Sequence, residues 1–130
     1  SLPVAVPASA HALRPTTAPA ISFIIPLFNC LELTRAGLVS LQATIPTGLT
    51  HEIILIDDGS TDGTRAWLAT LTAPFRVILN ERNLGYAKAN NRAAAAAHGE
   101  SLVLLNNDLI LLPHWLEPML RAHASLASGA

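Results

Sequence analysis

The stretch "HEIILIDDGSTDGTRAWL" (residues 51–68) joins an apolar run to a cluster of acidic residues. Four aliphatic residues, Ile53–Ile56, lead directly into Asp57 and Asp58, and Asp62 follows within the same turn. A short apolar run bounded by turn residues is typical of a strand that is buried on both faces. Acidic side chains directly after such a strand form either a surface turn or a binding site, so the surrounding sequence has to decide between the two.

The same pattern recurs along the chain. Four short apolar runs, expected to be strands, alternate with four segments of helical pattern. The expected strands are 21–25, 52–56, 76–80 and 101–105, and the expected helices are 31–44, 64–72, 86–98 and one that begins near Pro113. Alternation of buried strands with helices predicts an α/β fold with a mainly parallel sheet of about four strands and helices on both faces.

Composition limits the classes of function. Hydrophobic residues make up 51% of the 130-residue chain and charged residues 13%, with a net charge of −1. A net charge this close to zero gives no excess of basic residues that could bind nucleic acid, so no nucleic-acid partner is expected. The single cysteine, Cys30, excludes an internal disulfide and a multi-cysteine zinc site. No apolar run is long enough for a transmembrane helix. We therefore expect a cytoplasmic location, with membrane association of the full-length protein left open.

The two ends of the chain differ from the middle. Residues 1–20 are rich in proline and alanine and are expected to be a linker or arm, and residues 125–130 a tail. Residues 21–124 then form one domain, expected to be a truncated part of a longer polypeptide. Truncation would leave the last strand, Leu102–Leu105, with an unpaired edge, so self-association through that edge is also expected.

Polar residues cluster where the strands end. In a parallel sheet with right-handed crossovers these ends lie at one edge, where ligands of open α/β sheets bind. Polar loops are also common on any protein surface, so a purely structural role stays open at this point. The residues concerned are Pro26, Phe28 and Asn29 after the first strand, Asp57 and Asp58 after the second, Asn83 and Gly85 after the third, and Asn107 and Asp108 after the fourth.

Known loop types do not explain these residues. A calcium-binding loop of the EF-hand kind that starts at Asp58 would need a glutamate where the chain has Ala69. A glycine-rich phosphate loop would have to follow the first strand, where the sequence is "PLFN". If a nucleotide binds, a metal ion has to supply the missing positive charge. Asp108 offers the hard oxygen ligand that such a metal requires.

Four segments taken together resemble the family 2 glycosyltransferases. They are "ISFIIPLFN", "EIILIDDGSTDGT", "NLGYAKANN" and "LVLLNND", in the order and spacing of that family, across about residues 20–122. The resemblance implies the nucleotide-sugar-binding, Rossmann-like half of a GT-A fold. It also implies an inverting, metal-assisted transfer of a sugar from a nucleotide-diphosphate sugar to an acceptor hydroxyl, with Mg²⁺ or Mn²⁺ as cofactor. The acceptor is a saccharide, lipid or protein, for example in the synthesis of cell-envelope polysaccharide.

The resemblance also assigns roles to individual residues. Phe28 stands in place of the usual tyrosine against the nucleotide base, and Asp58 is the carboxylate that accepts a hydrogen bond from the base. Asn107 stands where the family has the first carboxylate of a D-x-D-like element, and Asp108 keeps the metal-binding carboxylate. The expected nucleotide-binding set is Pro26, Phe28, Asn29, Asp57, Asp58, Asn83, Gly85, Lys88 and Asn107.

The catalytic base of this family lies in the acceptor half, which is expected beyond residue 130, so the fragment is expected to be inactive alone. Two alternatives remain open. One is a non-catalytic nucleotide-sugar-binding module of a larger protein. The other is a sugar nucleotidyltransferase, which the lack of a glycine-rich loop after the first strand disfavours.

Overall fold

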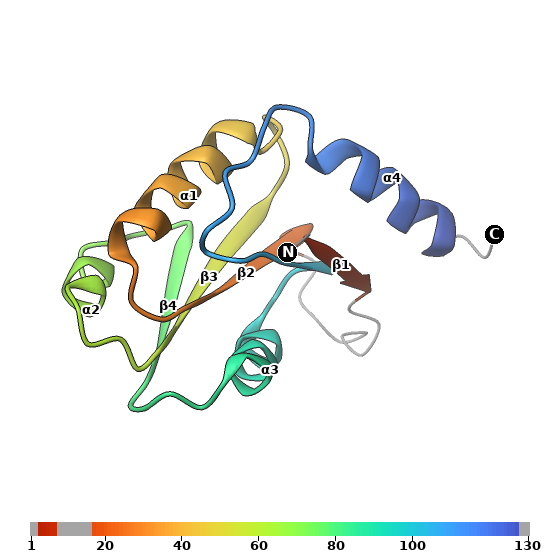
Figure 1. The fold of residues 1–130 in the computed structure, drawn as a ribbon. Helices are drawn as coiled ribbons and strands as arrows, with labels where there is room; N and C mark the ends of the chain where they lie inside the picture. The colour runs from red at the N-terminus through yellow and green to blue at the C-terminus, as the bar shows by residue number, and fades with distance from the viewer. Residues whose placement is uncertain (1–2, 8–16, 128–130) are drawn as a thin grey trace.

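The computed structural model describes residues 3–7 and 17–127, which form a mostly parallel sheet with helices on both faces (Figure 1). The elements are, in chain order, β1 (Val4–Pro7), β2 (Ile21–Leu27), α1 (Leu31–Thr44), β3 (His51–Asp58), α2 (Thr64–Leu68), β4 (Phe75–Asn80), α3 (Tyr86–Ala96), β5 (Ser101–Leu104) and α4 (Leu116–Ala127). The α/β class and the mainly parallel sheet are confirmed. The described sheet has five strands, against the four expected.

The strand order is β1-β5-β2-β3-β4, and the four strands from β5 to β4 are parallel. The central strands β2 and β3 are aligned from Ile21 opposite His51 to Leu27 opposite Asp57. Both strands are almost entirely buried, which explains their continuous aliphatic sequence. Their carboxyl ends lie at one edge of the sheet, as the right-handed crossovers require.

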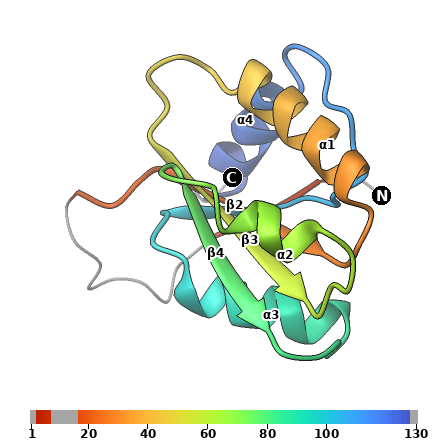
Figure 2. The same ribbon diagram turned by 90° about the vertical axis from the view of Figure 1, so that its left-hand side faces the viewer.

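α1, α2 and α4 lie on one side of the sheet and α3 on the other (Figure 2). The side chains of the central strands alternate between two cores on these two sides. The larger core lies under α1, α2 and α4 and contains Phe23, Leu55 and Val103. The smaller core lies under α3, where Ala89, Ala93 and Ala97 pack against Ile24, Ile54 and Ile56. The small alanine side chains let α3 lie close to the sheet. Gly99, just after α3, approaches even closer, since a Cβ there would come within 2.4 Å of the Ser22 nitrogen.

A buried polar network crosses the sheet at the end away from the expected site. Glu52, which is 7% exposed, accepts hydrogen bonds from Ser22 Oγ (2.5 Å), Arg76 Nη1 (2.7 Å) and the His98 backbone N–H (2.6 Å). Burial opposes the ionisation of Glu52, but these hydrogen bonds and the Arg76 charge outweigh it and lower the pKa of the carboxyl. The network ties β2, β3 and β4 to the turn after α3.

The expectation of an unpaired edge at the last strand is wrong. β1 lies antiparallel to β5, with Val4 opposite Leu104 and Pro7 opposite Ser101. The expected linker of residues 1–20 therefore contains a strand, and residues 1–2 and 8–16 lie outside the described residues. Since β1 pairs along Ser101–Leu104, self-association through that edge loses its structural basis.

Helix ends also differ from the expected ones. α2 ends at Leu68 instead of 72, and α4 begins at Leu116, after the loop that contains Pro113. α4 continues to Ala127, into the expected 125–130 tail, and residues 128–130 lie outside the described part. None of the helices in the described part of the chain has the length and apolar character needed to cross a bilayer.

Candidate functional site

Four loops meet at the carboxyl edge of the parallel strands: the first is residues 28–30 after β2, the second 59–63 after β3, the third 81–85 after β4 and the fourth 105–115 after β5. Side chains of the first and second loops hold these two loops together through hydrogen bonds to backbone N–H groups. Asn29 Oδ1 accepts hydrogen bonds from the N–H groups of Thr61 (2.8 Å) and Asp62 (3.2 Å), and Ser60 Oγ accepts one from the Asn29 N–H (2.7 Å). The Asn29 side chain is therefore engaged within the protein. Its φ of 56°, an unusual value for a residue other than glycine, fits this tightly bonded turn.

The two adjacent carboxylates point to opposite faces of the sheet. The sequence placed them after the strand, but β3 continues through Asp58, so Asp57 and Asp58 alternate as strand residues do. Asp57 is fully buried on the face of α2, where Oδ2 accepts a hydrogen bond from the Ser60 N–H (3.0 Å) and lies 3.6 Å from Arg65 Nε. Asp57 thus stabilises the turn and does not line the cleft described below.

Asp58 points to the other face and organises the third loop. Its Oδ1 accepts hydrogen bonds from Asn80 Nδ2 (3.0 Å) and the Leu84 N–H (2.9 Å), and its Oδ2 accepts one from the Gly85 N–H (3.0 Å). Gly59, with φ of 87°, lets the third loop lie against the end of β3, because a Cβ at this position would come within 2.7 Å of the Asn83 nitrogen. A carboxylate has about four acceptor positions, so Oδ2 keeps one for a ligand.

An open cleft of about 290 Å³ lies between these loops. Phe28, which is 47% exposed, and Tyr86, which is 55% exposed, contribute aromatic rings to its lining. The lining contains neither lysine nor arginine in the described part of the chain. It consists of Pro26, Leu27, Phe28, Asp58, Asn83, Gly85, Tyr86 and Asn107.

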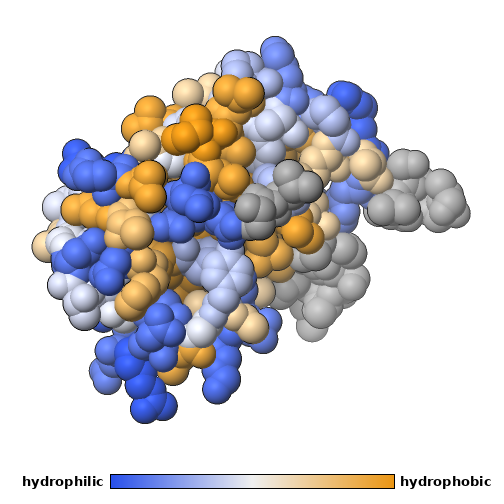
Figure 3. All heavy atoms as spheres, viewed as in Figure 1, coloured by the Kyte–Doolittle hydropathy of each residue, from blue (hydrophilic) through white to orange (hydrophobic). Residues whose placement is uncertain are grey.

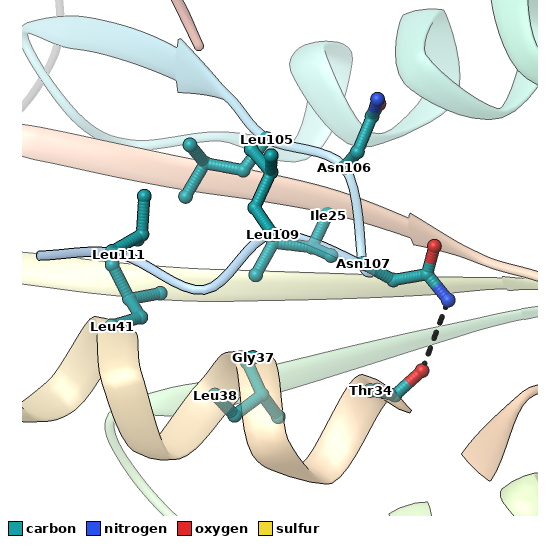
Figure 4. A pocket seen from close by; sticks show the side chains of 10 residues that line it. All are labelled: Ile25, Thr34, Gly37, Leu38, Leu41, Leu105, Asn106, Asn107, Leu109 and Leu111. Carbon is teal, nitrogen blue, oxygen red and sulfur yellow. Dashed lines mark hydrogen bonds between the residues drawn. The ribbon is translucent and has the colours of Figure 1, made fainter. Parts of the chain in front are cut away.

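The segment after β5 runs alongside α1, and its asparagines diverge (Figure 4). Asn107 points toward α1, where its Nδ2 donates to Thr34 Oγ1 (3.1 Å), and Asn106 points to the opposite side. The pocket that Figure 4 shows between α1 and this segment holds only about 10 Å³. It is a packing seam, too small for a ligand.

Tyr86, the first residue of α3, contacts this segment from the other side. Its hydroxyl donates a hydrogen bond to Asn106 Oδ1. Partial burial raises the pKa of Tyr86, and the negative charge of Asp108 raises it further. The phenol therefore stays protonated at neutral pH and acts as a donor. Asp108 directly follows Asn107, which lines the cleft, so Asp108 lies at the edge of the cleft.

The residues present fit a divalent cation that is shared with a ligand. Asp108 is exposed, and the described residues offer it neither a hydrogen bond nor an ion pair. No group of three or more His, Cys, Asp or Glu side chains among the described residues forms a closed metal cage. Mg²⁺-like ions are commonly held by one or two carboxylates together with substrate phosphates. Asp108, beside a cleft that lacks basic side chains, suits that arrangement.

The structure brings together most of the residues singled out from the sequence. Pro26, Phe28, Asp58, Asn83, Gly85 and Asn107 all line the cleft, and Asp108 lies beside it. Asp57 and Asn29 instead stabilise the loops, and Lys88 is exposed on α3 without lining the cleft.

Sequence reasoning missed Tyr86 and Asn106 as site residues. The signal for Tyr86 was its position directly after Gly85, where an aromatic residue starts an alanine-rich helix that needs only small side chains for packing. Asn106 belongs to the same "NND" run as Asn107 and Asp108. Nothing in the sequence pattern says that Asn106 faces α3.

Comparison with known proteins gives a family match. The model described as "Glycosyl transferase family 2" matches residues 22–128. The succinoglycan biosynthesis protein ExoO of Rhizobium meliloti is 32% identical over 114 residues, which cover 86% of this chain and 32% of that protein. The validoxylamine A glucosyltransferase of Streptomyces hygroscopicus subsp. limoneus is also 32% identical over 114 residues, which cover 84% of this chain and 25% of that protein.

Solved structures show the same fold. The mannosyltransferase PcManGT from Pyrobaculum calidifontis, in complex with GDP-Man and Mn²⁺, matches with a TM-score of 0.60 and 28% identity, over 73% of this chain and 29% of that one. TarS of S. aureus matches with a TM-score of 0.67 and 25% identity, over 78% of this chain and 19% of that one. The chain thus spans between 19% and 32% of the length of these four proteins.

Proposed function

This chain belongs to glycosyl transferase family 2, and from that premise we propose that its cleft binds the nucleotide-diphosphate part of a sugar donor. Residues 21–124 then form the donor-binding part of an inverting glycosyltransferase. The observation that carries the proposal is the convergence of Phe28, Asp58 and Asn107 on one cleft, with Asp108 beside it. These residues come from the ends of three different strands and meet only in the folded chain.

The base is assigned to the part of the cleft between Phe28 and Asp58. The exposed ring of Phe28 offers an apolar face for stacking. Asp58 Oδ2 keeps an acceptor position beside the one that the Gly85 N–H uses. A carboxylate acceptor favours a base with a ring N–H group at its pairing edge. Uracil and guanine have such a group, whereas adenine and cytosine do not.

The diphosphate is assigned to the side of Asn107 and Asp108. Two phosphates carry negative charge, and the cleft lining contributes no basic side chain from the described residues. A bound Mg²⁺ or Mn²⁺ would neutralise that charge and stabilise the leaving nucleotide. Asp108 would hold the cation, while Asn107, whose Nδ2 donates to Thr34, lines the cleft and keeps its Oδ1 free of that bond.

The remaining parts of the reaction lie outside this chain in our proposal. An acceptor hydroxyl, deprotonated by a general base, attacks the anomeric carbon from the face opposite the nucleotide. The bond from that carbon to the diphosphate oxygen breaks, the nucleoside diphosphate leaves, and the configuration at the carbon is inverted. Beyond residue 130, the acceptor half supplies that base, so the 130-residue chain binds donor but does not turn it over. The similarity to the succinoglycan biosynthesis protein ExoO supports an acceptor in cell-envelope polysaccharide synthesis, with the reaction placed in the cytoplasm.

A thermal-shift panel tests the proposal. UDP, GDP, ADP and CDP are each added with Mn²⁺ and with EDTA, and the melting temperature of the 130-residue chain is measured. We expect UDP or GDP to stabilise the chain most, and only with Mn²⁺ to the full extent. A ligand at about 100 times its Kd adds about 2.7 kcal/mol to the free energy of unfolding. Equal shifts for all four nucleotides, or none, would contradict the base and donor assignments.

A further inference from the structure

The segment that carries Asp108 is fixed firmly on the α1 side. Asn107 Nδ2 donates to Thr34 Oγ1, and the Leu111 N–H donates to Ser40 Oγ (2.9 Å). Gly37 lets the helix lie against the segment backbone, since a Cβ there would come within 2.9 Å of the Asn107 carbonyl oxygen. These contacts hold the backbone on both sides of Asp108 against α1.

On the α3 side the segment is held by the hydrogen bond from Tyr86 to Asn106. This contact, named here the Tyr86–Asn106 latch, joins residues 20 positions apart in the chain. Tyr86 follows Gly85, which Asp58 fixes through its backbone N–H. The latch therefore connects the loop proposed to bind the base to the segment proposed to hold the cation.

We propose that the Tyr86 hydroxyl is a positioning residue that holds the Asp108 segment in the place where its carboxylate meets a divalent cation and a diphosphate. The inference rests on the proposed function for its ligand, but the latch is a feature of the protein itself. Asn106 is anchored to α3 and Asn107 to α1, so the backbone that leads into Asp108 is held from both sides. Without the latch, Asn106 is released and Asp108 explores more positions, which weakens cation binding by a loss of preorganisation.

The test separates metal-dependent from metal-independent binding. The affinities of UDP and GDP are measured by calorimetry, with Mn²⁺ and with EDTA, for the 130-residue chain and for Tyr86→Phe. The variant keeps the ring that lines the cleft and loses only the hydroxyl. We expect Tyr86→Phe to reduce the gain in affinity that Mn²⁺ provides by about five- to tenfold, the worth of one hydrogen bond. The affinity in EDTA should stay within about twofold.

Two control variants define the result. Thr70→Val removes a hydroxyl that bonds to the Trp67 carbonyl oxygen at the end of α2, far from the latch, and should leave the Mn²⁺ gain unchanged. Tyr86→Leu removes the aromatic ring as well and should lower the affinity both with Mn²⁺ and in EDTA. An unchanged Mn²⁺ gain in Tyr86→Phe overturns the proposal. So does an equal loss with and without the metal, because it would place the hydroxyl on the nucleotide.

A measurement without ligand tests whether the Tyr86–Asn106 latch holds the segment, independently of the proposed function. Amide hydrogen exchange of the unliganded chain should be faster in Tyr86→Phe over residues 106–110 and unchanged in β3. Unchanged exchange over 106–110 overturns the latch. If the wild-type chain shows no Mn²⁺ gain, the proposed donor site fails, and the exchange result still decides whether Tyr86 holds the segment.

Discussion

Asp58 combines a structural and a binding role in one side chain. Its two oxygens accept hydrogen bonds from Asn80, Leu84 and Gly85, so it fixes the loop that forms one side of the cleft. The same carboxylate lines the cleft and is the proposed partner of the base. A substitution at Asp58 therefore changes the shape of the site as well as its chemistry, and a loss of binding alone would not identify the base contact.

We predict that Asp58→Asn lowers the free energy of unfolding by about 1.5–3 kcal/mol, because two backbone N–H groups lose a charged acceptor. The matched control is Asp62→Asn. Asp62 is exposed and accepts hydrogen bonds from the N–H groups of Leu31 (3.4 Å) and Thr64 (2.9 Å), and asparagine accepts such bonds at a helix start about as well as aspartate. Urea unfolding measures both variants. Equal effects would show that Asp58 does not organise the loop.

At the scale of the elements, the sheet is held together by different means at its two ends. Buried polar groups around Glu52 join β2, β3 and β4 at the amino end of the strands, whereas loop contacts made by Asn29 and Asp58 join the carboxyl end. The first network lies away from the cleft. It can be changed without touching a residue that we assign to ligand binding.

We predict that Glu52→Gln removes part of the pH dependence of stability. The folded-state pKa of Glu52 is below its ordinary value of 4.5, so its contribution is complete above that pH and is lost as the pH falls through the folded-state pKa. Glu52→Gln should destabilise the protein by about 1.5–3 kcal/mol at about pH 7, and by less at about pH 3.5. Urea unfolding at both values checks this.

The exposed Glu100→Gln serves as the control for this change, since it alters the same group outside the network. It should show little effect at either pH. A loss of stability in Glu52→Gln that is the same at both pH values would mean that Glu52 acts through its shape and not through its charge.

The order and type of most elements follow from the sequence, because buried parallel strands leave continuous aliphatic runs such as Ile53–Ile56. β1 could not be predicted, since the three apolar residues of "VAVP" stand between two prolines in a segment rich in proline and alanine, and they form a strand through pairing with β5. The opposite directions of Asp57 and Asp58 depend on where β3 ends. Propensity leaves that boundary open by a few residues, so only the structure separates the two carboxylates.

The role of Tyr86 could not be predicted from the sequence for a different reason. Its neighbours along the chain predict a helix, and its partner Asn106 lies beyond that helix and the whole of β5. Contacts between loops at the ends of separate strands depend on the three-dimensional path of each loop. The sequence pattern therefore indicated the edge of the sheet at which the site lies, and the structure showed which side chains at that edge face the cleft.

At the scale of the whole molecule, the cleft and the apolar surface occupy different regions. Figure 3 shows apolar side chains gathered over α1 and the segment after β5. The exposed ones there include Val39 (69% exposed), Ile110 (61%) and Leu112 (70%). None of these three residues lines the cleft, so a change to this apolar surface can be made without altering the cleft lining.

The central claim is that the cleft binds a nucleotide diphosphate with a divalent cation held by Asp108. The most direct measurement is a calorimetric titration of UDP and GDP into the wild-type chain and Asp108→Asn, each with Mn²⁺ and with EDTA. We predict that Mn²⁺ strengthens binding to the wild-type chain by at least about tenfold. Asp108→Asn should lose that gain while keeping its affinity in EDTA and its melting temperature, because the exposed carboxylate has no structural partner among the described residues. An equal Mn²⁺ gain in Asp108→Asn, or no binding of either nucleotide to the wild-type chain, would contradict the account.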